Sequence, residues 1–277
     1  MQMKIIQFDK MHATGNVYLY VDSRDEIIEN PETLAVKMSD NKFGAGSDGL
    51  VLILNSSVAD FRMRMFNADG SESAMCGNAA ICVGKYVYEK KMTDKTEINL
   101  ETDSGIKTLQ LQVLDDKVRK IKVDMDVPRL NAEEIPVNYP DAMNVPVKGM
   151  NFTCVSMGNP HAVTFVDDAD NFDVEATGKF IENHPFFPKR TNVEFAQILS
   201  SNRIRMRVWE RGTGETLSCG TGACATLVAA VLNGKTERKA TIELPGGELE
   251  AEWNEKTKRV TLTGTAEWIF NGNFKVN

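Results

Sequence analysis

The chain repeats itself at an offset of about half its length, and this repeat constrains the fold more than any other feature. Three paired features occur in the same order in both halves: Cys76-Gly77 with Cys219-Gly220, Gly15-Asn16 with Gly158-Asn159, and Glu101–Gly105 with Glu243–Gly247. The first two pairs are separated by 143 positions (219 − 76 = 143) and the third pair by 142. Self-similarity at a fixed period indicates repeated structural units.

Each half combines strand-like runs with one helical segment. Short alternating runs rich in Val, Ile, Leu and Thr predict strands, for example over Met3–Phe8, Val17–Val21, Leu50–Leu54, Ile98–Thr102 and Arg203–Trp209. Two longer segments have helical periodicity, and each begins directly after Cys-Gly: Asn78–Lys90 and Thr221–Leu232.

We therefore expect two similar α/β domains that face each other across a cleft. A pseudo-two-fold axis would bring the two Cys-Gly helix starts and the two Gly-Asn turns together at that cleft. The segment 128–146 contains four prolines and is the predicted linker. A single-domain barrel with an accidental repeat is the alternative.

Composition excludes several classes of function. The formal net charge of the 277 residues is −7, which argues against nucleic acid as the main partner. Arg203, Arg205 and Arg207 alternate along one predicted strand, and we interpret them as a solvated strand face. The first residues run into a strand without an apolar signal core, and the apolar run Ala223–Leu232 is far shorter than the roughly 20 residues of a membrane span. We expect a cytoplasmic protein with no membrane partner.

The five cysteines show no zinc-like spacing and no C-x-x-C motif. In a reducing compartment they are expected to be free thiols. Cys82 and Cys224 fall on the second turn of each predicted helix, where they should pack in the core, and Cys154 lies in a strand-like run. Cys76 and Cys219 remain as the pair at matching positions of the repeat.

These two cysteines have the setting of acid–base groups. A thiolate is the reactive form of cysteine, and a helix N-terminus lowers the thiol pKa because its free N–H groups stabilise negative charge. Each cysteine is followed by Gly and then by a residue with a capping-type side chain, Asn78 or Thr221. The glycines leave the first-turn N–H groups open to a carboxylate.

Two such helix starts in one cleft would place a sulfur on either side of a bound carboxylate. One thiolate could remove an α-proton from one face of a carbon, and the other thiol could return a proton to the opposite face. The converging N–H groups would stabilise the carbanion. The sequence shows no lysine-centred pyridoxal motif and no metal cluster, so we predict a reaction without a cofactor or metal.

At these residues the chain closely resembles the diaminopimelate epimerases over nearly its whole length. The motifs that carry the resemblance are Phe8–His12 with Gly15-Asn16, Phe66–Glu72, Met75–Asn78, Gly158–His161, Arg190–Asn192, Trp209–Gly212 and Ser218–Gly222. The resemblance implies two domains of the diaminopimelate-epimerase type, 1–128 completed by a strand over 265–277, and 129–264. Each would be a mostly antiparallel sheet or barrel around a central helix.

The family's roles carry over to matching positions. Cys76 and Cys219 would be the catalytic acid–base pair. Asn16, Gly77, Asn78, Gly220 and Thr221 would hold the carboxylate and amine at the reacting carbon. Asn67, Asn159, Asn192, Glu210 and Arg211 would bind the distal amino-acid group, since a bidentate arginine suits a carboxylate. His161 would line the wall of the site.

The implied reaction is the interconversion of LL- and meso-diaminopimelate, which supplies lysine and peptidoglycan precursors. Where the family usually has Cys-Gly-Asn-Gly-x-Arg-Cys, this chain has Ala79 and Ile81 at the fourth and sixth positions. These departures keep open a racemase or epimerase of another amino acid, such as histidine or lanthionine. A redox-responsive dithiol protein is a third hypothesis. The expected partner is a small amino-acid substrate, and a homodimer is retained as a candidate assembly.

Overall fold

The computed structural model describes residues 4–276, so Met3, where the first predicted strand was to begin, and Asn277 lie outside the described residues. The chain forms two compact units. One runs to Val123 and resumes at Gly264, and the other comprises Asp124–Thr263.

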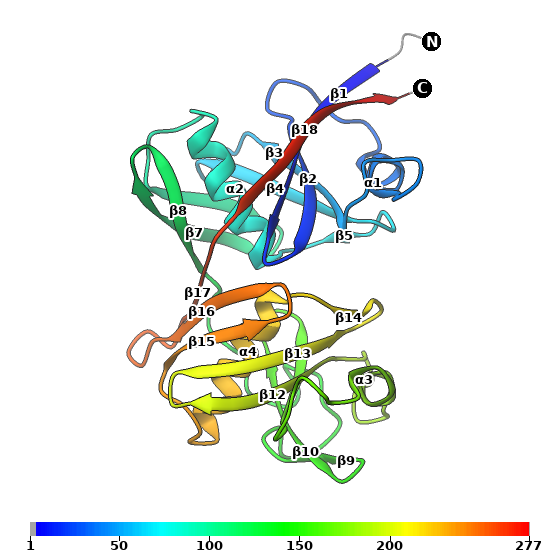
Figure 1. The fold of residues 1–277 in the computed structure, drawn as a ribbon, viewed down its shortest axis with the longest axis vertical. Helices are drawn as coiled ribbons and strands as arrows, with labels where there is room; N and C mark the ends of the chain where they lie inside the picture. Colours follow the sequence, from blue (N-terminus) through cyan, green and yellow to red (C-terminus); the bar gives the residue numbers. More distant parts are fainter. Residues whose placement is uncertain (1–3, 277) are drawn as a thin grey trace. The chain divides into compact units, whose positions relative to one another are not determined.

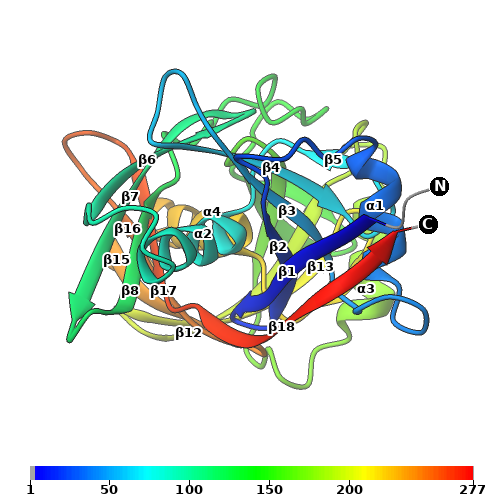
Figure 2. The same cartoon turned by 90° about the horizontal axis from the view of Figure 1, so that it is seen from above.

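The first unit consists of β-strands and two helices (Figure 1). In chain order they are β1 (Lys4–Ala13), β2 (Asn16–Asp22), α1 (Pro31–Ser39), β3 (Gly49–Leu54), β4 (Phe61–Asn67), β5 (Glu72–Ser73), α2 (Gly77–Glu89), β6 (Glu97–Thr102), β7 (Gly105–Leu114), β8 (Lys117–Asp124) and β18 (Glu267–Val276). β2 and β3, and β4 and β6, pair in parallel, while the other neighbours pair antiparallel. β18 lies alongside β1 (Figure 2), so the end of the chain completes this unit.

The elements of the second unit are β9 (Val145–Val147), β10 (Met150–Ser156), β11 (Pro160–Phe165), α3 (Val174–Glu182), β12 (Asn192–Ser200), β13 (Arg203–Glu210), β14 (Gly214–Thr216), α4 (Gly220–Leu232), β15 (Lys239–Leu244), β16 (Gly247–Trp253) and β17 (Val260–Gly264). From β10 onward, the second unit repeats the order of elements that runs from β1 to β8 in the first. β11 and β12, and β13 and β15, are the parallel pairs, as at the corresponding places of the first unit.

The strand register confirms the repeat. Tyr18 pairs with Gly49 in the first unit, and His161 pairs with Asn192 in the second. Both positions shift by the offset found in the sequence (161 − 18 = 143 and 192 − 49 = 143). The fold is the predicted mixed α/β type with mostly antiparallel strands, and the sheet of each unit is open rather than a closed barrel.

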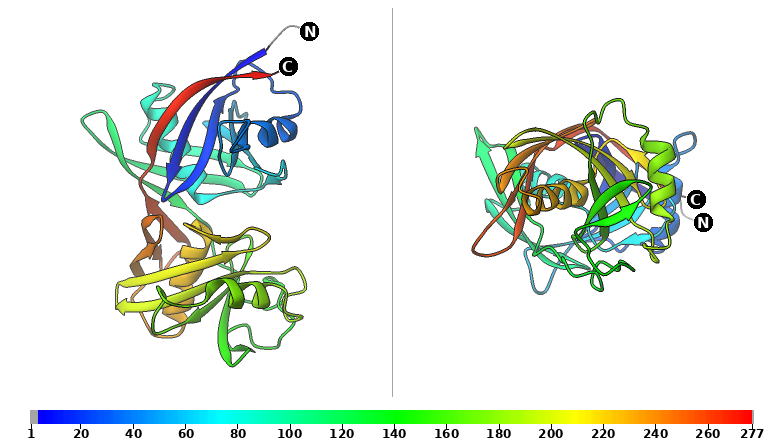
Figure 3. Two further views of the ribbon diagram at one scale, coloured as in Figure 1. Left: turned by 45° about the vertical axis from the view of Figure 1, so that its right-hand side comes forward. Right: turned by 90° about the horizontal axis from the view of Figure 1, so that it is seen from below.

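A buried helix occupies the centre of each unit. α2 lies between β7–β8 and β1–β2 (Figures 1 and 2), and α4 packs against β10, β11 and β16 (Figure 3). Every residue of α4 from Gly222 to Ala230 is buried. Each fully buried Leu or Val contributes about 1.5–3 kcal/mol, so this packing holds α4 in the core of the unit. Both helices coincide with their predictions to within a residue.

The linker prediction is wrong. The segment 128–146 belongs to the second unit, where Ile135 and Val145 are fully buried in its hydrophobic core. Arg129 forms a bridge with Ser156 at the end of β10. The prolines interrupt regular structure, but the apolar residues between them still pack.

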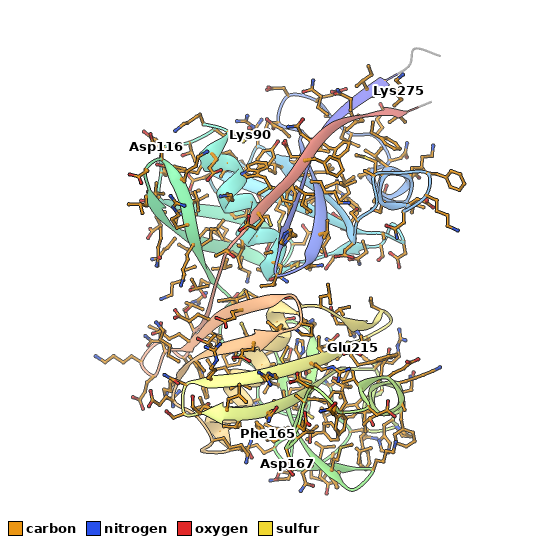
Figure 4. The ribbon with its side chains drawn as sticks, viewed as in Figure 1. Lys90, Asp116, Phe165, Asp167, Glu215 and Lys275 are labelled. Carbon is orange, nitrogen blue, oxygen red and sulfur yellow. The ribbon has the colours of Figure 1, made fainter. Side chains whose placement is uncertain are left out.

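The alternating arginines are paired with acids rather than arranged as a basic face. Arg207 donates to Glu215, which Figure 4 labels, at 2.7 Å. Arg205 bonds Asp170 and Glu243, and Arg203 also contacts Glu243. Among residues 4–276, no helix is long and apolar enough to span a membrane.

Candidate active site

In the first unit, Cys76 is the N-cap of α2. Its extended backbone (φ −138°, ψ 125°) presents the side chain at the helix start, and its sulfur lies 3.5 Å from Asn16 Oδ1. The amide of Asn16 donates to Asp48 at 2.8 Å, and the backbone N–H of Val17 donates to the same carboxylate. Asp48 thus orients Asn16 with its carbonyl oxygen toward Cys76. Asp48 was not predicted from the sequence, because it belongs to none of the motifs.

Two further predicted residues lie at ends of elements in this unit. Asn67 ends β4, and its amide donates to Ser71 Oγ at 3.0 Å across a tight turn. Gly70 in that turn has φ +87°, a conformation that L side chains rarely adopt. Asn78 is in the first turn of α2 and is 1% exposed. The N-cap residue of this helix is Cys76 rather than Asn78.

In the second unit, Cys219 is the N-cap of α4 and is 6% exposed. Its sulfur accepts from Gly222 N at 3.4 Å and lies 3.5 Å from Thr221 Oγ1. Burial raises the pKa of this thiol well above its ordinary value, and the carboxylates of Glu210 and Glu194 raise it further. The bonds from Thr221 and Gly222 oppose that rise without cancelling it. The expectation of a lowered pKa at this helix start is therefore wrong, because desolvation outweighs the helix N–H groups.

Glu210 lies next to Cys219. Burial raises the pKa of its carboxyl, and this effect outweighs the hydrogen bonds with Thr216 and Cys219, which act to lower the pKa. Thr216 Oγ1 donates to Glu210 Oε1 at 2.5 Å. Burial thus shifts both the thiol and the carboxyl toward their protonated forms. The structure thus places Glu210 beside Cys219, and its distal role stays a prediction.

Asn159 connects Cys219 to a buried pair. Its amide donates to Thr221 Oγ1 at 3.2 Å, and its carbonyl oxygen lies 3.1 Å from His161 Nε2. His161 Nδ1 lies 2.6 Å from Glu194 Oε1, and both of these side chains are fully buried. His161 was expected to line the wall of the site but is instead an interior residue.

Asn192 and Arg211 lie together at one end of the antiparallel pair β12–β13. The carbonyl oxygen of Asn192 accepts from the backbone N–H of Arg211 at 2.9 Å, and its amide donates to Pro160 O at 2.8 Å. Arg211 Nη1 donates to Lys189 O at 3.1 Å, and its side chain is exposed. Asn192 therefore anchors Arg211, whose guanidinium remains accessible.

The remaining cysteines and the two departures from the motif are interior. Cys82, Cys154 and Cys224 are buried free thiols, as predicted, and burial raises the pKa of Cys82 to about 12. Ala79 and Ile81 are both fully buried. No group of three or more His, Cys, Asp or Glu side chains that could hold a metal occurs within residues 4–276.

Comparisons with solved structures place the fold in a group of two-unit α/β proteins that includes epimerases and racemases. A PhzF-family protein of Bacillus anthracis has a TM-score of 0.73 at 18% identity, with 99% of each chain covered. A hydroxyproline epimerase of Agrobacterium vitis has a TM-score of 0.73 at 17% identity, with 100% of this chain and 93% of that chain covered.

The sequence comparisons then give the family. The family model described as diaminopimelate epimerase matches residues 8–131 and 153–269. Diaminopimelate epimerases of Methanococcus maripaludis (strain S2) and Acetivibrio thermocellus are each 53% identical to this chain, over 98% of it and over 100% and 99% of the relatives. The chain belongs to the diaminopimelate epimerase family.

Proposed function

We propose that this protein interconverts LL- and meso-diaminopimelate without a cofactor, with Cys76 and Cys219 as the acid–base pair. The observation that carries the proposal is the placement of one cysteine as the N-cap of the central helix in each repeated unit. Relatives that are identical to this chain at about half of their positions are named diaminopimelate epimerases, and the similarity extends over essentially their whole length.

Each half-site offers its cysteine a defined proton partner. The sulfur of Cys76 faces the side-chain carbonyl oxygen of Asn16, which can accept a hydrogen bond from the thiol. Cys219 faces the Glu210 carboxyl, which can take the thiol proton as the sulfur becomes the base. The N–H groups of Gly77 and Gly220, at the two helix starts, are suited to the substrate carboxylate.

Substrate selection is assigned to the exposed guanidinium of Arg211, which Asn192 holds by its backbone. A bidentate arginine binds a second carboxylate, which single-headed amino acids such as histidine lack. We assign Asn67 and Asn159 to the same distal group. Because Ala79 and Ile81 are buried, the substitutions that motivated a different substrate lie in the packed interior.

A homodimer in the cytoplasm completes the proposal. β18 is an edge strand of the first unit, and its Ile269 and Phe270 side chains are 45% and 47% exposed. Exposed apolar residues on an edge strand favour pairing with a second copy. Light scattering of the wild type and of Phe270→Glu tests this: loss of the dimer in the variant supports the assignment, and a monomeric wild type contradicts it.

Proton NMR in D2O tests the substrate. The reduced protein, without pyridoxal phosphate or metal, should exchange the α-proton of diaminopimelate and leave those of histidine and lysine intact. In Arg211→Ala this exchange should fall by about 100-fold or more, since a charge-assisted bidentate contact is lost. Exchange into histidine, or an unchanged rate in Arg211→Ala, would contradict the assignment.

A further inference from the structure

The first unit contains a polar pocket that the proposed reaction does not use. Its volume is about 800 Å³, and all of its lining residues belong to the first unit. Pockets that bind small molecules usually have volumes of about 300–1,000 Å³. This pocket lies at the C-terminal end of α2, whereas Cys76 caps the N-terminal end of the same helix. A helix of 13 residues is about 20 Å long, so the pocket is separate from the reacting cysteine.

The sheet supplies the floor of the pocket. Gln7 and Asp9 of β1 line it together with Asn271 and Asn273 of β18. Gln7 pairs with Asn273 across the two strands, and Asp9 pairs with Asn271, so all four side chains share one face of the sheet. Within residues 4–276, the three side-chain amides form no hydrogen bond with the protein. Each amide can therefore offer a ligand both a donor and an acceptor.

Three cationic residues line the pocket around this floor. Lys90, which Figure 4 labels, donates to both carboxylate oxygens of Asp9 at 2.9 Å. Arg24 donates from Nε and Nη2 to Asp22 at 2.9 Å, and its Nη1 has no acceptor within residues 4–276. The third cation is Lys91. The lining thus carries three cations and two carboxylates, which leaves an excess of one positive charge (3 − 2 = 1).

Lys91 keeps a side chain in a backbone conformation that favours glycine. Its φ is +60°, and the equivalent position of the second unit, offset by 143, is Gly234 with φ +64°. In both units the next residue donates its N–H to the carbonyl five positions earlier, so the two helices end in the same way. The ammonium of Lys91 lies 5.7 Å from the centroid of the Tyr88 ring and forms no ion pair within the described part of the chain. Because a Cβ is costly in this conformation, the lysine indicates a requirement for its charge.

The second unit has a pocket at the equivalent place with a different lining. Positions 7, 22 and 24, which line the pocket of the first unit, correspond by the offset of 143 to Met150, Phe165 and Asp167. These residues line a smaller pocket of about 410 Å³ together with Phe172. Among the residues that the structure describes, no lysine or arginine lines this second pocket. The repeated fold thus produces a hollow in both units, and only the first unit surrounds it with cations.

The charges and the amides define the class of ligand. Asp9 and Asp22 are already paired, so the available donors, Arg24 Nη1 and the Lys91 ammonium, favour an anionic oxygen group. The excess of one positive charge matches a single carboxylate, whereas a phosphate group carries up to about two negative charges. The amide carbonyls of the floor can accept from an ammonium or hydroxyl group of the same ligand. We propose that this pocket binds a small amino acid or hydroxy acid through its carboxylate, at a site separate from the two cysteines.

Nitrogen-15 NMR of the full chain, without diaminopimelate, tests the site. The probes are L-aspartate, L-lactate and inorganic phosphate. At least one of the two carboxylates should shift the backbone amide signals of residues 22–24, 90–92 and 271–273, with a dissociation constant below about 10 mM. The absence of saturable shifts at these amides, or phosphate binding as tight as that of the better carboxylate, would overturn the proposal. The measurement requires no epimerase activity, so its outcome does not depend on the proposed reaction.

The variant Arg24→Gln tests the carboxylate contact. It removes the Nη1 donor and its charge, so the dissociation constant of the better carboxylate should rise by about tenfold or more. Arg64→Gln is the matched control, because Arg64 forms the same two-bond pair with Glu72, at 2.7 and 3.0 Å, and does not line the pocket. The control should change the dissociation constant by less than about twofold. Unchanged binding in Arg24→Gln, or an equal loss in both variants, would refute the assignment.

Lys91→Gly is a second variant that should fold, because glycine occupies the equivalent position of the second unit and adopts the positive φ without strain. Loss of the charge should raise the dissociation constant by about threefold or more. Lys258→Gly is its matched control, since Lys258 also has φ +60° but lies in the second unit, outside the pocket. Unchanged binding in Lys91→Gly, or an equal rise in Lys258→Gly, would contradict the proposal.

Discussion

The variant Gly222→Ala probes a close contact beside Cys219 in the second unit. The new methyl would lie 2.8 Å from Glu194 Oε1, 3.2 Å from Cys219 Cβ and 3.3 Å from Cys219 Sγ. The carboxylate can move only by weakening its bond to His161, because both side chains are fully buried.

The magnitude follows from two destabilising terms and one stabilising term. Overpacking of a filled interior costs about 1–3 kcal/mol, and weakening a charge-assisted hydrogen bond adds about 1.5–3 kcal/mol. Alanine is favoured over glycine in a helix by about 1 kcal/mol, and less in the first turn. We therefore expect a net loss of about 2–4 kcal/mol in the unfolding free energy, together with a fall in kcat of at least about tenfold.

Ala79→Gly is the matched control because Ala79 occupies the equivalent position of the first unit. Removing its methyl should cost only about 0.5–1 kcal/mol from helix propensity, plus a small packing loss. Urea denaturation and steady-state epimerisation measure both variants. If Gly222→Ala is as stable and as active as the wild type, the close approach of Glu194 to α4 is refuted.

Other predictions address reactivity, pH and packing. Cys76 is half-buried and the other cysteines are buried, so iodoacetamide at about pH 8 should alkylate one thiol rapidly in the native protein and Cys76→Ala should remove that reaction; rapid labelling of a second thiol would contradict this. The pKa of Cys82 is raised to about 12, so its protonated form stabilises the fold below the thiol's unfolded value, and that stability is lost as the pH rises from about 9 to 12. Cys82→Val should therefore reduce the decline in melting temperature over this range, and an unchanged decline would refute the assignment. Leu227 is fully buried in α4, and Leu227→Ala should lower the unfolding free energy by about 2–5 kcal/mol in urea titrations; a loss below about 1 kcal/mol would mean that α4 is not a core element.

Much of the fold could be predicted because the same sequence features occur at matching positions of the two halves. The Cys-Gly pairs locate the starts of α2 and α4, an apolar run locates β3, and alternation locates β13. The helices α1 and α3 were missed, since each has only nine residues and too few turns for a clear period. The proline-rich segment was misread because composition alone does not reveal that Ile135 and Val145 are buried.

Some site residues could likewise be predicted from the sequence and others could not. Motif and repeat identify Cys76, Cys219 and Asn159, whose side chains carry distinctive chemistry. The partners Asp48 and Glu194 lie on other elements, and only tertiary contacts connect them to the cysteines. An alignment of the two halves could have revealed Glu194, because the equivalent residue of the first half is Val51, which lies in an apolar strand.

The sign of the Cys219 pKa shift could not be predicted from its helix position. The helix N-terminus stabilises a thiolate, but the sulfur is also buried beside Glu210 and Glu194. Which effect dominates depends on desolvation, a property of the packed unit rather than of the local sequence.

The central claim is that two sulfurs divide the proton transfers, and epimerisation of LL-diaminopimelate by Cys76→Ala and Cys219→Ala tests it most directly. Each variant lacks either the proton acceptor or the proton donor, so turnover should fall by at least about a thousandfold in both, with folding retained by circular dichroism. Turnover within about tenfold of wild type in either variant would contradict a mechanism that uses both cysteines.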